Sequence, residues 1–345
     1  MPILTDKDKT SSASISSADY EMIANAVVSS PTASVRDGQN IFLMWTRPFT
    51  MMYKIPVFKR VWIYLFFLAL YALLVDSVGF PNLPTKLFKE AGVAGTYSSV
   101  VLGLLLVFRT NSAYERWWEG RKLWGQLTND SRNLCMKVSS MVAISELEKR
   151  QFGELVISFA YALKHHLRGT TPNEQLPGVN QLSDSELEHL PLTIANRIYQ
   201  TVASWQEKGL IDGLTFIILD QHTRALMDIC GACERIKNSP IAVSYRAFMR
   251  QGIALNLLTW PWYLTQEFSV WFSMPPLLVG AYFLIGIELI AEDVEDPFGH
   301  DGDDLPLDNI CTSIRTTVSK ILPVSRAQRF TTTIAKPRVD LLKSP

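Results

Sequence analysis

Four long, mostly apolar stretches of the chain carry no charged side chain, and they occur as two close pairs. Val61–Val75 and Gly92–Phe108 form the first pair, and Gly252–Gln266 and Phe268–Ile287 form the second, separated only by Glu267. A helix needs about 20 largely apolar residues to cross the hydrocarbon core of a bilayer. With their flanking residues, the four stretches predict two helical hairpins that cross a membrane. The predicted spans are residues 58–80, 92–110, 247–266 and 268–289.

The second stretch changes character at Arg109, after which charged and polar residues follow closely. No proline interrupts the segment between Gly92 and Trp124. We therefore expect one helix that leaves the bilayer and continues into water. Arg109 and Arg116 would either attract anions at the inner mouth through their local field or pair with the nearby Glu115 and Glu119.

The uncharged part of this helix carries two stripes at helical spacing. One stripe combines apolar residues with a threonine: Thr96, Val100, Leu104 and Phe108. The other contains the small residues Gly95, Ser99 and Gly103, a spacing that lets membrane helices approach closely. A closely packed helix that turns an apolar stripe toward a central axis predicts a pore wall. The alternative is that the first stripe packs on the preceding helix.

The charges predict the orientation and exclude one class of partner. Basic residues flank both outer ends of the first hairpin, which the positive-inside rule places in the cytosol. Both ends of the chain are then cytosolic, and the host membrane is expected to be the cell membrane, plasma or inner. The formal net charge of the 345 residues is zero, which argues against nucleic acid as a partner.

The segment between the hairpins, residues 111–245, predicts a cytosolic helical region. No block in it is long enough to span a membrane. Helical periodicity recurs in Leu123–Val138, Glu146–Leu167, Leu190–Glu207 and Leu214–Ile236. Residues 41–320 are thus expected to form one all-helical membrane domain, flanked by flexible tails at residues 1–40 and 321–345.

Cysteine and histidine give no recognisable catalytic motif. Cys230 and Cys233 form a CxxC without a second pair to complete a zinc site, and no βαβ pattern accompanies them. The five histidines lack HExxH spacing, and no Ser-His-Asp set or phosphate-binding glycine loop is present. The sequence therefore predicts a protein that is not an enzyme. A membrane-bound metalloenzyme using Cys230, Cys233 and nearby histidines remains as an alternative.

An acidic run, Glu292–Asp308, suggests a calcium site. Asp301, Asp303 and Asp304 offer the oxygen ligands that this cation prefers, although the spacing is not that of an EF-hand. The competing interpretation is a turn with helix caps and salt bridges, because Asp296-Pro297 is typical turn chemistry.

Several blocks in this order resemble the bestrophin family of ion channels, particularly its bacterial members. The blocks are Phe108-Arg109-Thr110-Asn111, Tyr114-Glu115-Arg116-Trp117-Trp118-Glu119, Arg121-Lys122-Leu123-Trp124-Gly125, Cys233-Glu234-Arg235-Ile236, Ser239-Pro240, Asp296-Pro297-Phe298-Gly299 and Asp303-Asp304-Leu305-Pro306-Leu307-Asp308. The resemblance implies a homopentamer with one axial pore. It implies a hydrophobic neck at Val100, Leu104 and Phe108 and a cytosolic constriction at Leu214. It also implies calcium ligands at Asp301 and Asp304.

The function that this resemblance implies is passive conduction of chloride or other monovalent anions. The expected partners are further copies of the chain, membrane lipid and the conducted ions, and calcium is the one cofactor to consider. Two alternatives stay open: a monovalent cation channel of the bacterial type, and a non-conducting, membrane-anchored binding or regulatory protein in which the apolar stripe is only packing.

Overall fold

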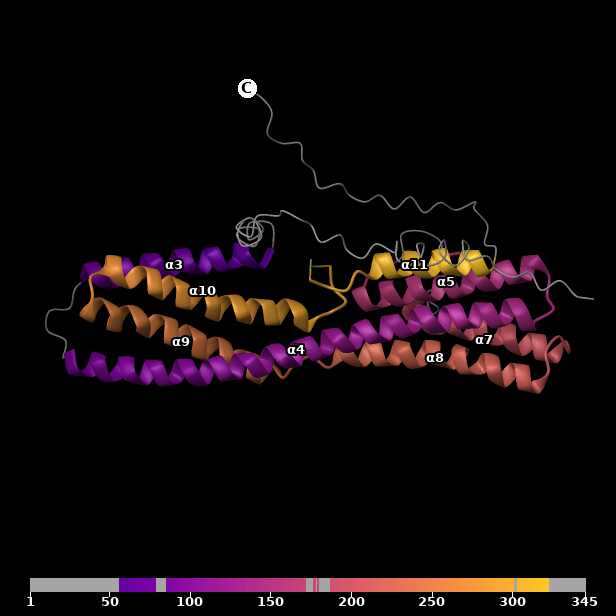
Figure 1. Cartoon of the computed structure of the whole chain (residues 1–345), viewed down its shortest axis with the longest axis horizontal. Helices are drawn as coiled ribbons and strands as arrows, with labels where there is room; N and C mark the ends of the chain where they lie inside the picture. Colours follow the sequence, from indigo (N-terminus) through magenta and orange to yellow (C-terminus); the bar gives the residue numbers. More distant parts are fainter. Residues whose placement is uncertain are drawn as a thin grey trace, which may run out of the picture. The chain divides into compact units, whose positions relative to one another are not determined.

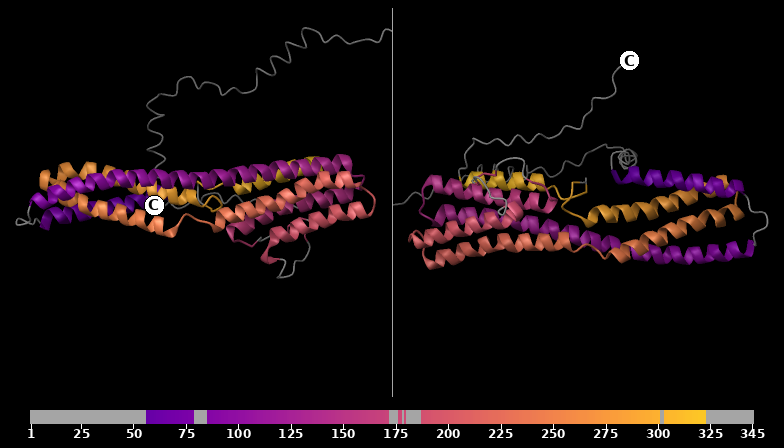
Figure 2. Two further views of the ribbon diagram at one scale, coloured as in Figure 1. Left: turned by 90° about the horizontal axis from the view of Figure 1, so that it is seen from below. Right: turned by 180° about the vertical axis from the view of Figure 1, so that it is seen from behind.

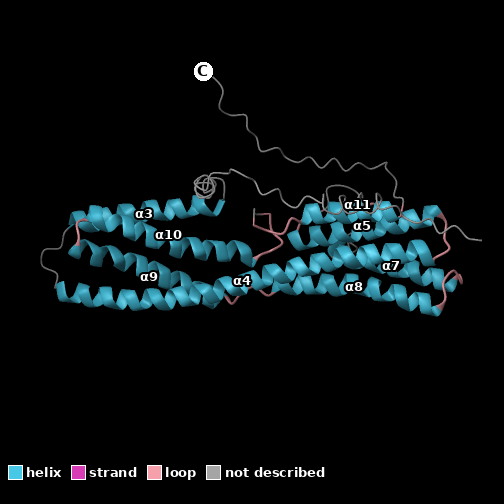
Figure 3. Cartoon of the chain, viewed as in Figure 1, coloured by secondary structure: helices cyan, strands magenta, loops and turns pink. Residues whose placement is uncertain are grey.

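The computed structural model describes residues 56–78, 85–171, 176–177, 179, 187–300 and 303–322. Every regular element in these ranges is an α-helix (Figure 3). The helices are α3 (Pro56–Val78), α4 (Thr85–Met141), α5 (Glu146–Arg168), α7 (Leu190–Glu207), α8 (Gly213–Asn238), α9 (Val243–Glu267), α10 (Val270–Glu295) and α11 (Leu307–Ile321). Both expected tails, apart from residues 321–322, and Asp301 lie outside the described residues.

α4 is a single helix of 57 residues without a proline. At 1.5 Å per residue it is roughly 85 Å long. The expected continuity through Arg109 is therefore present. Its first half packs with α9 and α10, which also contact α3, and its second half packs with α5, α8 and α11 (Figure 1). The two further views show the same neighbours (Figure 2).

Three of the described helices are long and apolar enough to cross a membrane. They contain Lys59–Val78, Gly92–Met141 and Val270–Glu295. α9, the fourth predicted span, is not among them. Its sequence includes Arg246, Arg250 and the buried Asn256, which lower its mean hydropathy. Composition alone therefore identifies three of the four predicted spans.

α4 and α9 approach closely at small residues. A Cβ placed on Gly252 would lie 2.6 Å from Cδ2 of Leu102. One turn further along α9, Asn256 donates through Nδ2 to Oγ of Ser98 at 2.7 Å and accepts from Oγ of Ser99 at 3.2 Å. Hydrogen bonds between such side chains stabilise helix pairs in membranes. Gly95 takes part as well, because its carbonyl accepts a hydrogen bond from Asn256.

A second group of helices, made of α5, α7, α8, α11 and the second half of α4, has its own apolar core. The core includes Trp124, Phe152, Phe159, Leu163, Ile194, Trp205, Leu226, Cys233 and Ile314. Local signals define the helix ends: Ser145 and Glu148 form a capping box at the start of α5, and Gly169 ends that helix in the left-handed conformation, φ 63°. All four periodic segments of this region lie in helices.

α11 was not among the expected helices, although its pattern is readable. Leu307, Cys311, Ile314 and Val318 are buried at spacings of four, three and four residues. The adjacent acidic run suggested a calcium site or a turn rather than the start of a helix. An ion-pair cluster fastens the start of α11 to α5: Oδ1 of Asp308 lies 2.9 Å from Nζ of Lys164, and Oδ2 lies 2.7 Å from a guanidinium nitrogen of Arg168.

We expect this cluster to give α11 an acid-sensitive attachment. Partial burial alone would raise the pKa of Asp308, but hydrogen bonds from Lys164 and Arg168 outweigh it and lower the pKa to about 2. An unfolded aspartate has a pKa of about 3.9. The stabilisation is therefore complete above about pH 4 and is lost as the pH falls through about 2.

Thermal unfolding of the wild type and Asp308→Asn across this range measures the effect. The difference between their melting temperatures should be constant above about pH 4 and shrink on acidification. Asp228→Asn, which changes an exposed carboxylate of α8, serves as the control. A melting-temperature difference that does not vary between about pH 4 and pH 2 would contradict the assignment.

Candidate functional site

The three predicted neck residues lie on an exposed face of α4. The exposed fractions are 69% for Val100, 56% for Leu104 and 56% for Phe108. The alternative interpretation was that these side chains pack on the preceding helix. In the single chain none of the described helices covers them. The same face carries further exposed apolar residues: Val93, Tyr97, Val101, Val107, Tyr114 and Trp118. Their role as a pore neck remains a prediction.

Arg109 points in another direction from its neighbour Phe108. Successive residues of an α-helix are about 100° apart around its axis. The Arg109 side chain is accordingly buried, with 1% of the residue exposed. Its two terminal nitrogens lie 3.2 Å from Oε1 of Glu288 and 3.5 Å from Oε2 of Glu295, both on α10. These are ion-pair distances, but the atoms are not aligned as hydrogen bonds.

The two carboxylates have other partners that complete the cluster. Arg250 of α9 donates through Nε to Glu288 at 3.0 Å and lies 2.6 Å from Glu292. Oε1 of Glu295 accepts a hydrogen bond from the Ile241 amide at 3.0 Å. Buried charges are tolerated when opposite charges and hydrogen bonds compensate them. This cluster therefore fixes α4 against α9 and α10 directly beside the predicted neck residues.

The expected pairing of Arg109 and Arg116 with Glu115 and Glu119 was wrong. Arg109 does not face the open side of α4, and its partners lie on α10. Arg116 donates to the carbonyls of Glu295 at 3.1 Å and of Ile236 at 2.6 Å. Glu119 instead pairs with Arg235, at 3.3 Å. The partners of both arginines are distant in sequence, so the nearby acidic residues suggested the wrong pairs.

Leu214 lies in the first turn of α8, and 66% of it is exposed. Asp212 caps this helix by accepting a hydrogen bond from the Thr215 amide at 2.8 Å. The neighbouring Ile211 is buried, whereas Ile217 is exposed. The alternative interpretation of Leu214 as a buried core residue does not hold in the single chain, where its side chain is exposed. Its place at a cytosolic constriction remains a prediction.

The acidic run shows part of the expected turn chemistry. Asp296 accepts a hydrogen bond from the Phe298 amide at 3.4 Å. The Asp303 carbonyl accepts from Nε1 of Trp117 at 3.0 Å, and the Asp304 carboxylate lies against Gly299. Because Asp301 is outside the described residues, the calcium pair of Asp301 and Asp304 remains a prediction.

The two cysteines of the CxxC motif are buried free thiols. Burial, with smaller contributions from Glu234 and Glu119, raises the pKa of Cys233 to about 12. Burial raises the pKa of Cys230 as well, and Glu234 adds to the effect. Thiols protonated at neutral pH are poor nucleophiles. Both cysteines therefore serve as small core residues of α8.

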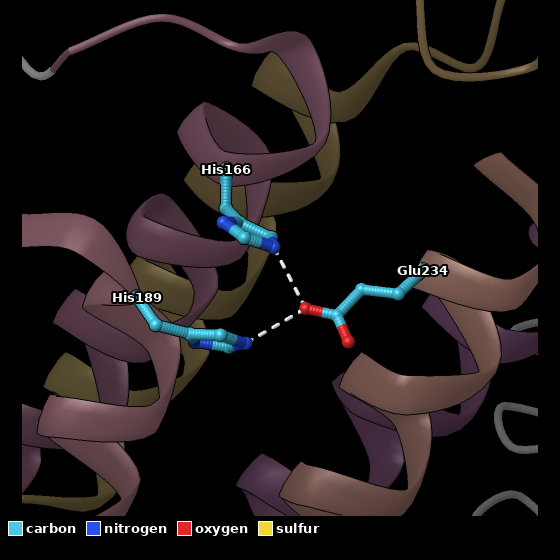
Figure 4. Close-up of side chains that lie close together, drawn as sticks. All are labelled: His166, His189 and Glu234. Carbon is cyan, nitrogen blue, oxygen red and sulfur yellow. Dashed lines mark hydrogen bonds and ion pairs between the residues drawn. The ribbon is translucent and has the colours of Figure 1, made fainter. Parts of the chain in front are cut away.

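The structure also brings together a cluster of potential metal ligands that sequence reasoning missed. Nε2 of His166 and Nε2 of His189 lie 2.7 Å and 2.9 Å from the same oxygen of Glu234 (Figure 4). The side chains come from α5, from the residue before α7 and from α8. No short sequence motif contains all three, so only the helix packing reveals the cluster.

Comparisons with known proteins identify the family. The family described as bacterial and fungal bestrophin proteins matches residues 36–320. The chain belongs to this family. A Synechocystis protein named voltage-dependent anion channel-forming protein is 36% identical to this bestrophin over 234 residues, which are 65% of this chain and 75% of that protein. The protein YneE of Escherichia coli, with the same descriptive name, is 32% identical over 219 residues, 62% of this chain and 71% of that protein.

Solved structures agree at the level of the fold. A crystal structure of a mutant bacterial bestrophin homolog from Klebsiella pneumoniae matches with a TM-score of 0.66 at 20% identity. The match covers 76% of this chain and 98% of that chain. Family membership and the names of the relatives indicate a channel and not an enzyme. The metalloenzyme alternative is thereby removed.

Proposed function

We propose that this bestrophin is an anion channel whose pore is lined by α4 from several copies of the chain. The observation that carries the proposal is the exposed apolar stripe of Val100, Leu104 and Phe108 beside a buried charge cluster that fixes the helix. The channel-forming names of the relatives support the same activity. The conducted ions would be chloride and other monovalent anions.

The assembly follows from the small number of helices in one chain. A single chain has too few spans to enclose a pore, so the neck must form between copies, and the resemblance to bestrophins suggests five. In this arrangement α9 is the fourth span, and its Arg250 pairs with Glu288 and Glu292 of α10 at the inner end. The termini then lie in the cytosol, and the channel lies in the cell membrane.

The proposed neck would control ion passage through its apolar side chains. An apolar ring can exclude water and thereby block ions until it widens. Aliphatic and aromatic groups carry no net charge that would select anions over cations. Selectivity would then arise from charged groups and helix dipoles outside the neck. A second constriction at Leu214 would act on ions at the cytosolic end of the pore.

Reversal potential in planar bilayers under a KCl gradient tests this function. We expect it to shift toward the chloride equilibrium potential. A shift toward the potassium equilibrium potential would replace the anion channel by a cation channel. Intact oligomers that carry no current under any applied voltage would favour the non-conducting alternative, and a monomer in mild detergent would exclude a pore between copies.

The same recordings test the calcium site at Asp301 and Asp304. If calcium binds there and gates the channel, adding it and then chelating it will change open probability reversibly. The double variant Asp301→Asn/Asp304→Asn should lose that response. An identical response in the variant would place any calcium effect elsewhere.

A further inference from the structure

Three side chains of the metal-binding type meet where α5, the residue before α7, and α8 come together (Figure 4). The three ligand atoms of His166, His189 and Glu234 lie within 4.8 Å of one another. The two imidazole rings stack, with their centroids 4.6 Å apart. We propose that these residues bind one zinc ion. The proposal does not depend on ion conduction.

The donor set favours zinc over the hard cations. Two imidazole nitrogens and one carboxylate are typical zinc ligands, and a water molecule can fill the fourth position of a tetrahedral site. Calcium and magnesium prefer sets made entirely of oxygens. Sγ of Cys230 lies 3.6 Å from Oε1 of Glu234. This thiol is fully buried and donates a hydrogen bond to Glu234, so we do not count it among the ligands.

The present geometry needs only a small adjustment to accept the ion. Bonds of about 2.0–2.2 Å to a tetrahedral zinc ion place neighbouring ligand atoms roughly 3.3 Å apart. The two nitrogen–oxygen distances are 2.7 Å and 2.9 Å. Separations larger by roughly half an ångström are within reach of side-chain rotations. The side chains are between 26% and 35% exposed, so an ion can reach them from solvent.

Zinc binding at His189 would compete with a helix cap. Nδ1 of His189 accepts a hydrogen bond from the Leu192 amide at 3.2 Å, at the start of α7. A neutral imidazole carries one proton, which in this arrangement is on Nε2 and points at Glu234. Zinc on Nε2 replaces that proton, and the neutral ring then carries its proton on Nδ1. Binding therefore exchanges the cap hydrogen bond for a metal bond.

Because His189 has two roles, a substitution can remove the metal ligand and keep the helix cap. Asparagine is among the strongest N-cap residues, so His189→Asn keeps the cap of α7 and removes the metal ligand. Glu234→Gln and His166→Gln remove the other two ligands at similar size. His165→Gln is the matched control, because His165 is the adjacent histidine and lies against Oγ1 of Thr170 at 2.9 Å, outside the cluster.

Calorimetric titration of zinc chloride into the metal-free, untagged, full-length protein in detergent tests the site. We expect one zinc ion per chain, not displaced by excess calcium. The affinity should fall by more than about tenfold in each ligand variant, a loss seen even when residues that only support a ligand are changed. His165→Gln should bind as the wild type does. Absence of stoichiometric binding, or unchanged affinity in Glu234→Gln, would overturn the proposal.

Cobalt substitution in the wild type gives a second test that needs no variant. Cobalt in a tetrahedral site shows intense visible absorption bands, whereas octahedral cobalt shows weak ones. Saturable, intense bands at one cobalt per chain would support the site. Weak bands, or absorption that does not saturate, would overturn it even if the ligand variants fail to fold.

Discussion

Replacing Arg109 by methionine should destabilise the protein strongly. Glu288 and Glu295 would lose the cation between them while both carboxylates stay buried. Removing one partner of a buried ion pair typically costs about 3–5 kcal/mol, because a charge is left without compensation. We expect a large loss of folded protein after detergent extraction, and a lower melting temperature for what remains.

Two variants show whether charge compensation is the cause. Arg235→Met removes an exposed pair, with side chains 68% and 45% exposed, and should have little effect, since such pairs contribute about 0–1 kcal/mol. Arg109→Met combined with Glu288→Gln and Glu295→Gln removes the cluster's central charges together and should recover much of the lost stability. If the triple variant is as unstable as the single one, packing rather than charge explains the effect.

Leu104→Ala and Phe108→Ala should increase ion flow several-fold. Both substitutions widen the proposed neck and shorten the apolar surface that excludes water, which lowers the barrier to ions. Single-channel conductance and open probability in planar bilayers measure the change. The effect should be larger for Phe108, because its side chain loses more volume.

Phe66→Ala provides the matched control for the neck. Phe66 is an apolar residue of α3 and, at 66%, is about as exposed in the single chain as the neck residues. Its removal should leave the conductance unchanged. Normal currents in both neck variants, with normal assembly, would contradict the placement of the pore on this face of α4.

Helices with strong periodicity were predictable from the sequence. The uncharged block of α4 and its charged continuation lack any helix-breaking residue, and this local property determined the long helix. The small residues Gly95, Ser99 and Gly103 predicted a close helix contact. Gly95 and Ser99 do hydrogen-bond with Asn256 of α9, but a Cβ on Gly95 or Gly103 would meet no atom within 4 Å, and the close approach lies at Gly252 of α9 instead. The neck residues could be nominated because an apolar stripe and a family resemblance pointed to the same three positions.

Features that depend on long-range contacts were not predictable. Arg109 contacts Glu288 and Glu295 on α10, and nothing near Arg109 in the sequence distinguishes these partners from Glu115 or Glu119. The proposed zinc ligands His166, His189 and Glu234 likewise come from segments that only folding brings together. α11 differs, because the helical spacing of its buried residues can be read directly in the sequence.

The unbroken course of α4 limits how the proposed neck can open. All residues from Thr85 to Met141 are helical, so this helix lacks a joint between the membrane and the second group of helices. If the helix does not bend, a rotation of its second half about the helix axis turns Phe108 through the same angle. A rotation of about 100° would exchange the directions of adjacent residues. A fraction of that, with α10 carried along through its ion pairs to Arg109, would turn the apolar side chains away from the axis. A ligand that twists the helices around Trp124 would therefore act on the neck mechanically.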